Sequence, residues 1–106
     1  MIRHMAIIRW NPNVTSAAIQ EFQTALANHV TASGTVLAVT HGPNQRVGPG
    51  RYDYAVVLDF ESMEAWRAFD GHPLHDIARG ALLSNAKSVV GAQIVVATPD
   101  DKAESM

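Results

Sequence analysis

The stretch Gly71-His72-Pro73-Leu74-His75-Asp76 marks the start of a helix in the second half of the chain. Pro73 suits the first helical position, because its missing N–H would have no partner there in any case. The preceding glycine lets the backbone turn before the helix. Asp76 falls in the first turn, where the helix dipole favours a carboxylate. The stretch therefore predicts that His72 lies at the helix entry and His75 in its first turn.

Two of the five histidines of the chain fall in this stretch, three residues apart. A helix that starts at Pro73 would turn both imidazoles toward one side. Because histidine titrates near neutrality, a polar cavity there could use one of them as a proton carrier. The alternative is structural, with His72 as a cap-like surface residue and His75 as a partly buried packing residue. A metal site is not predicted, because two imidazoles with Asp70 or Asp76 nearby make an incomplete ligand set.

The composition fits one small domain and excludes several classes of function. The chain has 106 residues, of which 47% are apolar, a net charge of −2 and eight scattered basic residues, so a nucleic-acid partner is not expected. It has no cysteine, which rules out disulfides and thiolate chemistry. Arg3, His4 and Arg9 interrupt the apolar start, which is too short for a membrane span. A cytoplasmic protein without a membrane partner is expected.

Four segments have the composition of strands: residues 2–10, 35–40, 52–60 and 88–97. The first has apolar residues on both faces, which indicates a strand covered on both sides. His4 is the polar exception on its face, either a satisfied half-buried histidine or a group that lines a cavity. In the third segment, one face carries Tyr52, Tyr54, Val56, Leu58 and Phe60. Gly91 marks a possible bulge in the last strand.

Helical spacing of apolar residues separates these strands. Thr15 or Ser16 is expected to cap a helix that runs to about Thr31 and ends before Gly34. His29 lies beside its apolar stripe near the C-terminus, where the helix dipole would favour a protonated imidazole, and is expected to be structural. A second helix follows Ser62, with the apolar stripe Met63, Trp66 and Phe69, and the third begins at Pro73.

Two segments have no periodicity. Residues 42–50 contain three glycines and two prolines, which indicates a loop, and we expect it to form a mobile rim that could overhang a pocket. Residues 99–106 form an acidic, polar tail that is expected to be disordered. One domain over residues 1–98 is therefore predicted.

The order strand, helix, strand, strand, helix, strand is the ferredoxin-like βαββαβ pattern of an α+β fold. In this pattern the helices cover one face of a four-stranded antiparallel sheet. The other face here stays apolar, with Ala6 and Ile8 or Met5 and Ile7, with Val56 and Leu58, and with valines from the last strand. Because a large exposed apolar face is unfavourable, we expect a homodimer through the sheet faces.

The sequence resembles the stress-responsive A/B-barrel (Dabb) family of dimeric α+β barrels. The likeness lies in Ile2–Ile8, Tyr52–Ser62 and His72–His75, with the aromatic Phe69 just before, and it extends from Ile2 to about Ala97. It implies a homodimer and a pocket in each subunit between the sheet and the helices. A plant polyketide cyclase of this family, which forms olivetolic acid, needs no cofactor and uses a histidine as general base.

That histidine matches His75 here, and the tyrosine that assists it falls at Phe69, which has no hydroxyl. The resemblance therefore implies a cofactor-independent cyclase or isomerase acting on a small apolar or aromatic, polyketide-like carbonyl compound. His75 would remove a proton next to the carbonyl, while His72 or His4 would orient it or stabilise charge. The expected substrate contacts are Trp10, Tyr52, Tyr54, Val56, Leu58 and Phe69.

Two other functions stay open. One is a non-catalytic, stress-related dimer that binds a small ligand, which Phe69 in place of the tyrosine favours. The other is a cofactor-free monooxygenase, because antibiotic monooxygenases share the architecture. No cofactor is predicted in any of these cases, and family membership transfers the fold more safely than the function.

Overall fold

Strands and helices follow one another along the chain in the predicted order. The structure is a computed structural model, and it describes residues 1–97. Its elements are β1 (Ile2–Trp10), α1 (Ser16–Ser33), β2 (Val36–Pro43), β3 (Tyr54–Phe60), α2 (Met63–Asp70), α3 (Pro73–Leu83) and β4 (Ala86–Val95). The second helical segment of the ferredoxin-like pattern is thus divided into α2 and α3 at the His72-Pro73 step.

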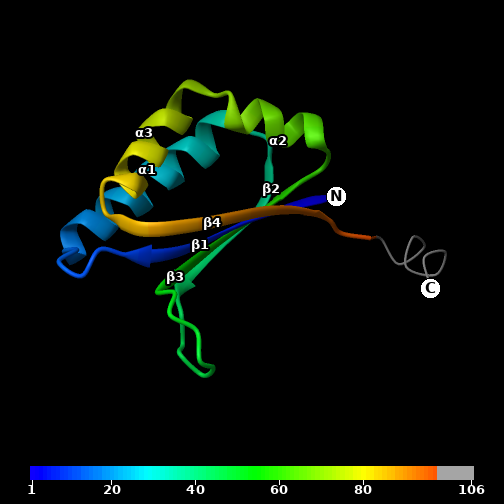
Figure 1. Ribbon diagram of the computed structural model, residues 1–106. Coiled ribbons are helices and arrows are strands. Elements are labelled where there is room, and N and C mark those ends of the chain that lie inside the picture. The colour runs from blue at the N-terminus through cyan, green and yellow to red at the C-terminus, as the bar shows by residue number, and fades with distance from the viewer. Residues whose placement is uncertain (98–106) are drawn as a thin grey trace.

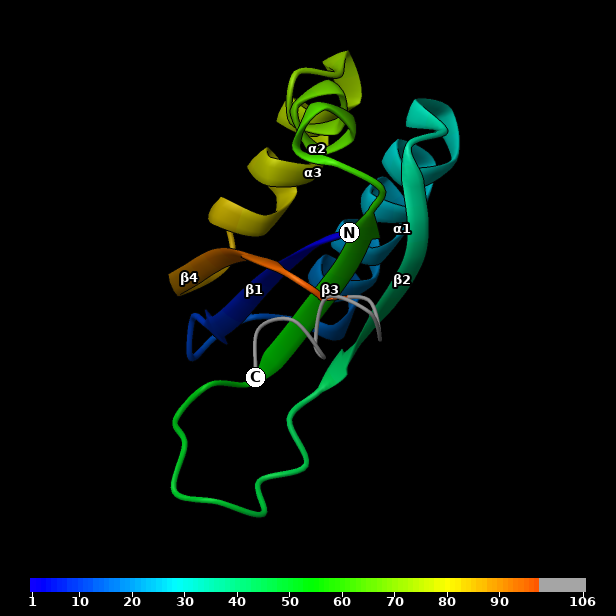
Figure 2. The same ribbon diagram turned by 90° about the vertical axis from the view of Figure 1, so that its right-hand side faces the viewer.

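The four strands form one antiparallel sheet in the order β2-β3-β1-β4. The two central strands are the first and third, and the crossing connections contain the helices, as the ferredoxin-like fold requires. All three helices lie on one face of the sheet, and the opposite face carries none of them (Figure 1). Figure 2 shows the same layering from the side, with α1 and α3 lying next to each other above the strands. The predicted fold class is confirmed.

Local side-chain chemistry sets the helix boundaries. Thr15 caps α1, because its hydroxyl accepts the N–H of Ala18 at 3.1 Å. Gly34 ends that helix in the left-handed conformation, with φ at 66°, which a residue without Cβ adopts at least cost. Ser62 caps α2 in the same way as Thr15 caps α1. These boundaries agree with the caps read from the sequence.

The core lies between the sheet and the helices. Alternate residues of β3 are buried, and together with Ile8 they meet the inner sides of Phe22, Leu26 and Phe69 from the helices. Val56 and Leu58 belong to this buried set and face the helices. Their expected place on the uncovered face is therefore wrong, because the pleat turns residues of one parity to one side.

The uncovered face is apolar at its centre. In the sheet register Met5 is paired with Val57 and Ala92, and Ile7 is paired with Ala55 and Val90. At one end of β1, Arg3 donates to Asp59 at 2.7 Å and 3.1 Å. That hydrogen bond lowers the pKa of the Asp59 carboxyl. An apolar strip with an ion pair beside it thus faces away from the helices.

Several predicted boundaries need correction. β2 runs from Val36 to Pro43 and does not end at residue 40 as predicted, so His41 lies within the strand. β3 starts at Tyr54, which leaves Tyr52 in the preceding loop. The register of β1 and β4 continues past Gly91, and its shift lies between Arg9 and Trp10, so the expected bulge position is wrong.

The loop between β2 and β3 projects away from the helices (Figures 1 and 2). None of its residues lines either of the cavities described below, so it does not form the expected rim. The polar tail predicted for residues 99–106 lies outside the described residues. Among the helices of residues 1–97, none is long and apolar enough to cross a membrane.

Candidate functional site

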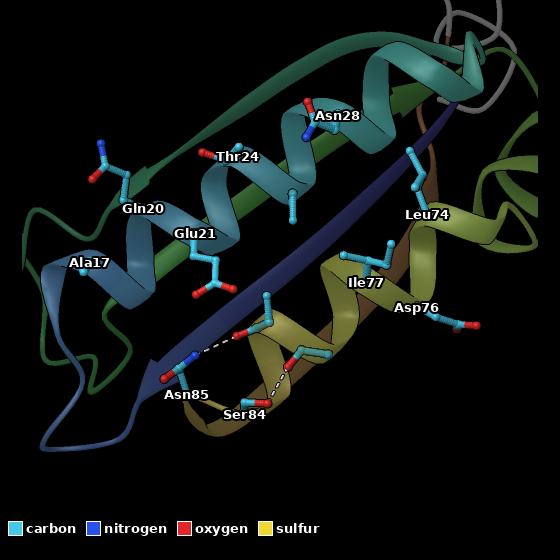
Figure 3. A pocket seen from close by; sticks show the side chains of 13 residues that line it. Ala17, Gln20, Glu21, Thr24, Asn28, Leu74, Asp76, Ile77, Ser84 and Asn85 are labelled. Carbon is cyan, nitrogen blue, oxygen red and sulfur yellow. Dashed lines mark hydrogen bonds between the residues drawn. The ribbon is translucent and has the colours of Figure 1, made fainter.

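A groove of about 810 Å³ lies between α1 and α3 on the outer side of the helix layer. Figure 3 shows Gln20, Glu21, Thr24 and Asn28 of α1 along one side of it and Leu74 and Ile77 of α3 along the other. The side chains of Ser84 and Asn85 at its end donate to backbone carbonyls of α3. These are the groups of a solvated helix surface, and no histidine lies among them.

A second cavity, of about 380 Å³, lies inside the fold between α3 and the sheet. Three histidines from three different elements meet there: His4 from β1, His29 from α1 and His75 from α3. The other lining residues are mostly apolar: Ala6, Phe22, Leu26, Val56, Leu58, Phe69, Ala78, Arg79, Leu82, Leu83, Val89 and Gly91. A mostly apolar cavity with a few convergent polar groups has the character of a small-molecule site. We call it the histidine cavity.

His75 is held by an acidic partner at this cavity. Its Nε2 lies 3.2 Å from Oδ1 of Asp70, the last residue of α2, and its side chain is 24% exposed. Because a carboxylate only accepts, Nε2 carries the proton in this contact. The neutral imidazole then has its lone pair on Nδ1, which lies 3.9 Å from Oδ1 of the exposed Asp76. This carboxylate–imidazole arrangement holds a histidine in a defined tautomer that can accept a proton.

His4 is the polar group that β1 contributes. Its Nδ1 lies 2.7 Å from Nε2 of Gln93 on the neighbouring strand β4. Since the amide nitrogen donates, Nδ1 is the acceptor and Nε2 carries the proton of the neutral ring. Burial lowers the pKa of His4, although nearby Asp70 opposes that effect. His4 is thus a neutral N–H donor at neutral pH.

His29 is the most deeply buried of the three, with 1% of its surface exposed. Its Nε2 lies 2.8 Å from the carbonyl oxygen of Phe69, and the two rings are stacked with centroids 3.7 Å apart. Burial lowers the pKa of His29, and the neighbouring His75 and His72 add to that effect. The helix dipole was expected to favour a protonated imidazole at His29. That expectation is wrong, because desolvation favours the neutral imidazole and outweighs the dipole. The sequence placed this residue only beside the apolar stripe of α1.

His72 lies outside the histidine cavity and caps α3. Its Nδ1 accepts the N–H of Leu74 at 3.1 Å, which gives this histidine the role of an N-cap side chain. The ring centroid of His72 is 5.6 Å from that of His29. His72 is thus close to the cavity, but its acceptor nitrogen is used by the helix.

The expected substrate contacts divide into two groups. Val56, Leu58 and Phe69 line the histidine cavity. Trp10 and Tyr54 are buried beyond it, with their ring centroids 5.8 Å apart, and Tyr52 lies in the loop before β3. The Tyr54 hydroxyl is hydrogen-bonded to Gln23 of α1 and His41 of β2. No lining residue of the cavity carries a hydroxyl group.

The arrangement does not provide a ligand set for a metal. Within residues 1–97, no group of three or more histidine, aspartate or glutamate side chains is placed to hold an ion. The described chemistry of the cavity is therefore that of two neutral imidazoles, a carboxylate-bound imidazole and the cation of Arg79.

Comparison with protein families gives one match, the family model described as the stress responsive A/B barrel domain, over residues 2–96. No curated protein matches the chain.

Solved structures with the same fold are numerous. A dimeric ferredoxin-like protein of unknown function from Thermobifida fusca has 30% identity and a TM-score of 0.79, with 90% of each chain covered. A second such dimeric protein, from Jannaschia, has 21% identity and a TM-score of 0.81, over 90% of this chain and 98% of that one. The hydroxynitrile lyase of Passiflora edulis has 14% identity and a TM-score of 0.79, over 91% of this chain and 93% of that one.

Proposed function

This chain belongs to the stress responsive A/B barrel (Dabb) family, and from that premise we propose that it is a small enzyme of the cyclase or isomerase type. It moves a proton next to the carbonyl group of a small apolar or aromatic, polyketide-like compound, and it uses no cofactor. The single observation that carries this proposal is the meeting of His75 and His4 in one apolar cavity. Enolate formation needs a group that accepts the proton from carbon and a hydrogen-bond donor that stabilises the charge on oxygen.

His75 is the general base. Asp70 accepts its Nε2–H, so the imidazole is oriented and its positive charge is stabilised once it has taken a proton. The mostly apolar walls of the cavity lower the local dielectric and so strengthen the electrostatic interactions beside them.

His4 stabilises the charge that develops on the carbonyl oxygen. Its Nε2 carries the proton because Gln93 occupies Nδ1, and burial keeps the ring neutral by lowering its pKa. A neutral N–H donor that lines an apolar cavity can bind an enolate oxygen without giving up its proton. We assign this role to His4 and not to His72, since the acceptor nitrogen of His72 caps α3.

The functional unit is a homodimer in which two sheets pack face to face. The uncovered face of the sheet places Met5, Ile7, Val57 and Val90 in register, and such a strip is stabilised when a second copy covers it. Dimeric structural relatives support this assembly. The histidine cavity lies on the other side of the sheet, so each subunit keeps its own site.

The test is proton exchange at the carbon next to a ketone. Phenylacetone, an aromatic ketone without other functional groups, is incubated with the protein in D2O, and loss of its benzylic proton signal is followed by NMR. The wild-type protein is expected to accelerate exchange, and His75→Gln is expected to lose about 10²–10⁴-fold of that acceleration. His41→Gln, a histidine of β2 outside the cavity, serves as the matched control. Equal rates for wild type and His75→Gln would remove His75 from the mechanism.

A second candidate function is binding of a small ligand without turnover. The observation that favours it is the cavity wall at Phe69, which is 5% exposed and offers no hydroxyl to a reacting oxygen. The same experiment distinguishes the two functions. Saturable chemical-shift changes of the cavity residues with phenylacetone, together with no exchange, would support a binding protein.

A further inference from the structure

We propose that the histidine cavity recognises small organic carboxylates, and that Arg79 of α3 is the residue that binds the carboxylate group. The inference rests on the proposed site and names the class of compound that this site takes. Arg79 lines the cavity together with the three histidines. A guanidinium group is always charged and presents paired N–H donors that match the two oxygens of a carboxylate.

Arg79 supplies the permanent charge of the cavity. The other polar lining residues are His4, His29 and His75, and burial favours the neutral form of the first two. No acidic side chain is among the lining residues. Asp70, the nearest carboxylate on α2, contacts Nε2 of His75. The cavity therefore combines apolar walls with one permanent cation among its lining residues, which complements an apolar anion. The carboxylates of Asp70 and Asp76 lie beside His75 at its edge.

Among residues 1–97, no carboxylate side chain is paired with Arg79. Within the part of the chain that the structure describes, Arg3 is paired with Asp59 and Arg46 with Asp53. The remaining ion pairs of residues 1–97 involve His75, so Arg79 has no carboxylate within ion-pair distance. Arg79 is exposed and lines the cavity, so the N–H donors of its guanidinium group are available to a ligand.

The spacing along α3 places the cation beside the general base. His75 and Arg79 are four residues apart in the helix, so their side chains share one face, one turn from each other. Ala78 and Leu82 of the same helix line the cavity between and beyond them. A ligand whose carboxylate binds Arg79 would therefore hold its carbon skeleton against the apolar wall, within reach of His75. The substrate class that fits is an aromatic or aliphatic keto acid.

The experiment compares two ligands of equal shape, phenylacetate and phenylacetamide, which differ in charge and cannot react. Binding is measured by NMR titration of the full chain, with His4 and His75 signals as reporters of the cavity. The wild type is expected to bind phenylacetate about tenfold more tightly, because a hydrogen bond to a charged group contributes more than a neutral one. Arg79→Gln is expected to abolish that preference, and Arg79→Lys to keep part of it.

Arg67→Gln is the matched control, because Arg67 is an exposed residue of α2 that does not line the cavity. It is expected to keep the wild-type preference. Equal affinity of the wild type for both ligands, a preference that survives in Arg79→Gln, or no binding of either ligand at millimolar concentration would each overturn the inference. Since the readout is binding, a protein that binds phenylacetate through Arg79 but does not accelerate exchange of the benzylic protons of a keto acid, phenylpyruvate, in D2O would refute the catalytic proposal alone.

Discussion

The imidazole of His29 stacks on the ring of Phe69 at a centroid distance of 3.7 Å, and its Nε2 lies 2.8 Å from the carbonyl oxygen of the same residue. One residue of α2 thus provides both a hydrophobic surface and a hydrogen-bond acceptor for a histidine of α1. The contact satisfies a polar group that is almost completely buried. It also joins two helices at the end of the histidine cavity, and it gives the pH dependence of stability a specific origin.

The free energy of unfolding is expected to decrease as the pH falls below about 6.5. Burial lowers the pKa of His29 in the folded state, so the unfolded chain takes up the proton first. The unfolded state then binds more protons than the folded state, and stability must rise with pH across this range. Urea denaturation at a series of pH values measures the slope. His29→Leu is expected to reduce the slope, and the part that remains is expected from His4, whose pKa is also lowered by burial. Parallel curves for wild type and variant would contradict a contribution of His29.

His72→Ala is expected to cost about 1 kcal/mol of stability without changing the rate of proton exchange. The variant removes the nitrogen that accepts the N–H of Leu74 and so leaves the start of α3 without its cap. His72→Asn, which restores a capping side chain, should recover the stability. A fall in the exchange rate for both variants, in folded protein, would instead give His72 a part in the chemistry.

His4→Leu is expected to lower the rate of proton exchange on phenylacetone by about 10²-fold, the usual loss when one donor to an oxyanion is removed. The substitution takes away the N–H that Gln93 directs by its contact with Nδ1. Circular dichroism of the variant checks that the sheet is intact. An exchange rate equal to that of the wild type would show that the enolate oxygen is bound elsewhere.

Two glycines are expected to respond in opposite directions to the same substitution. Gly34→Ala should destabilise the protein by about 1 kcal/mol, because φ at 66° is unfavourable for a residue with Cβ. Gly80→Ala should stabilise it by up to about 1 kcal/mol, because the position is inside α3 and a Cβ would meet nothing within 4 Å. Thermal denaturation of the two variants measures both effects, and equal shifts in melting temperature would contradict the argument.

Val57→Asp is expected to convert the dimer to a monomer. The residue is paired with Met5 in the centre of the uncovered sheet face, where a buried unpaired carboxylate would oppose association. Light scattering after size-exclusion chromatography reports the mass. Thr24→Asp adds the same charge on the outer surface of α1 and should stay dimeric. A monomeric wild type would contradict the proposed dimer, and a dimeric Val57→Asp would place the interface elsewhere.

The helix caps and the alternation of the strands could be read from the sequence because they are local properties. Thr15, Ser62 and Pro73 act on neighbouring backbone groups within one helical turn. The buried parity of β3 repeats every two residues along one strand. The side of the sheet that the helices cover was harder to assign, since β1 is apolar on both faces.

The site depended on contacts between residues far apart in the chain. His4 receives its partner from Gln93 across the sheet, and His29 receives its acceptor from Phe69 across two helices. No periodicity within one element reports such a pair. His29 in particular could not be distinguished from a residue at the edge of the apolar stripe.

The sequence by itself determined the ferredoxin-like order of elements and the helix starts, because capping and periodicity act over a few residues. Which residues of β1 and β3 form the uncovered sheet face was decided by the tertiary structure. Only the tertiary structure decided which of the five histidines meet in a cavity and which one caps a helix. Only the tertiary structure, too, placed Arg79 beside them. The physical reason is that desolvation and hydrogen-bond partners, which set the state of each imidazole, come from elements that the sheet brings together across long separations in the chain.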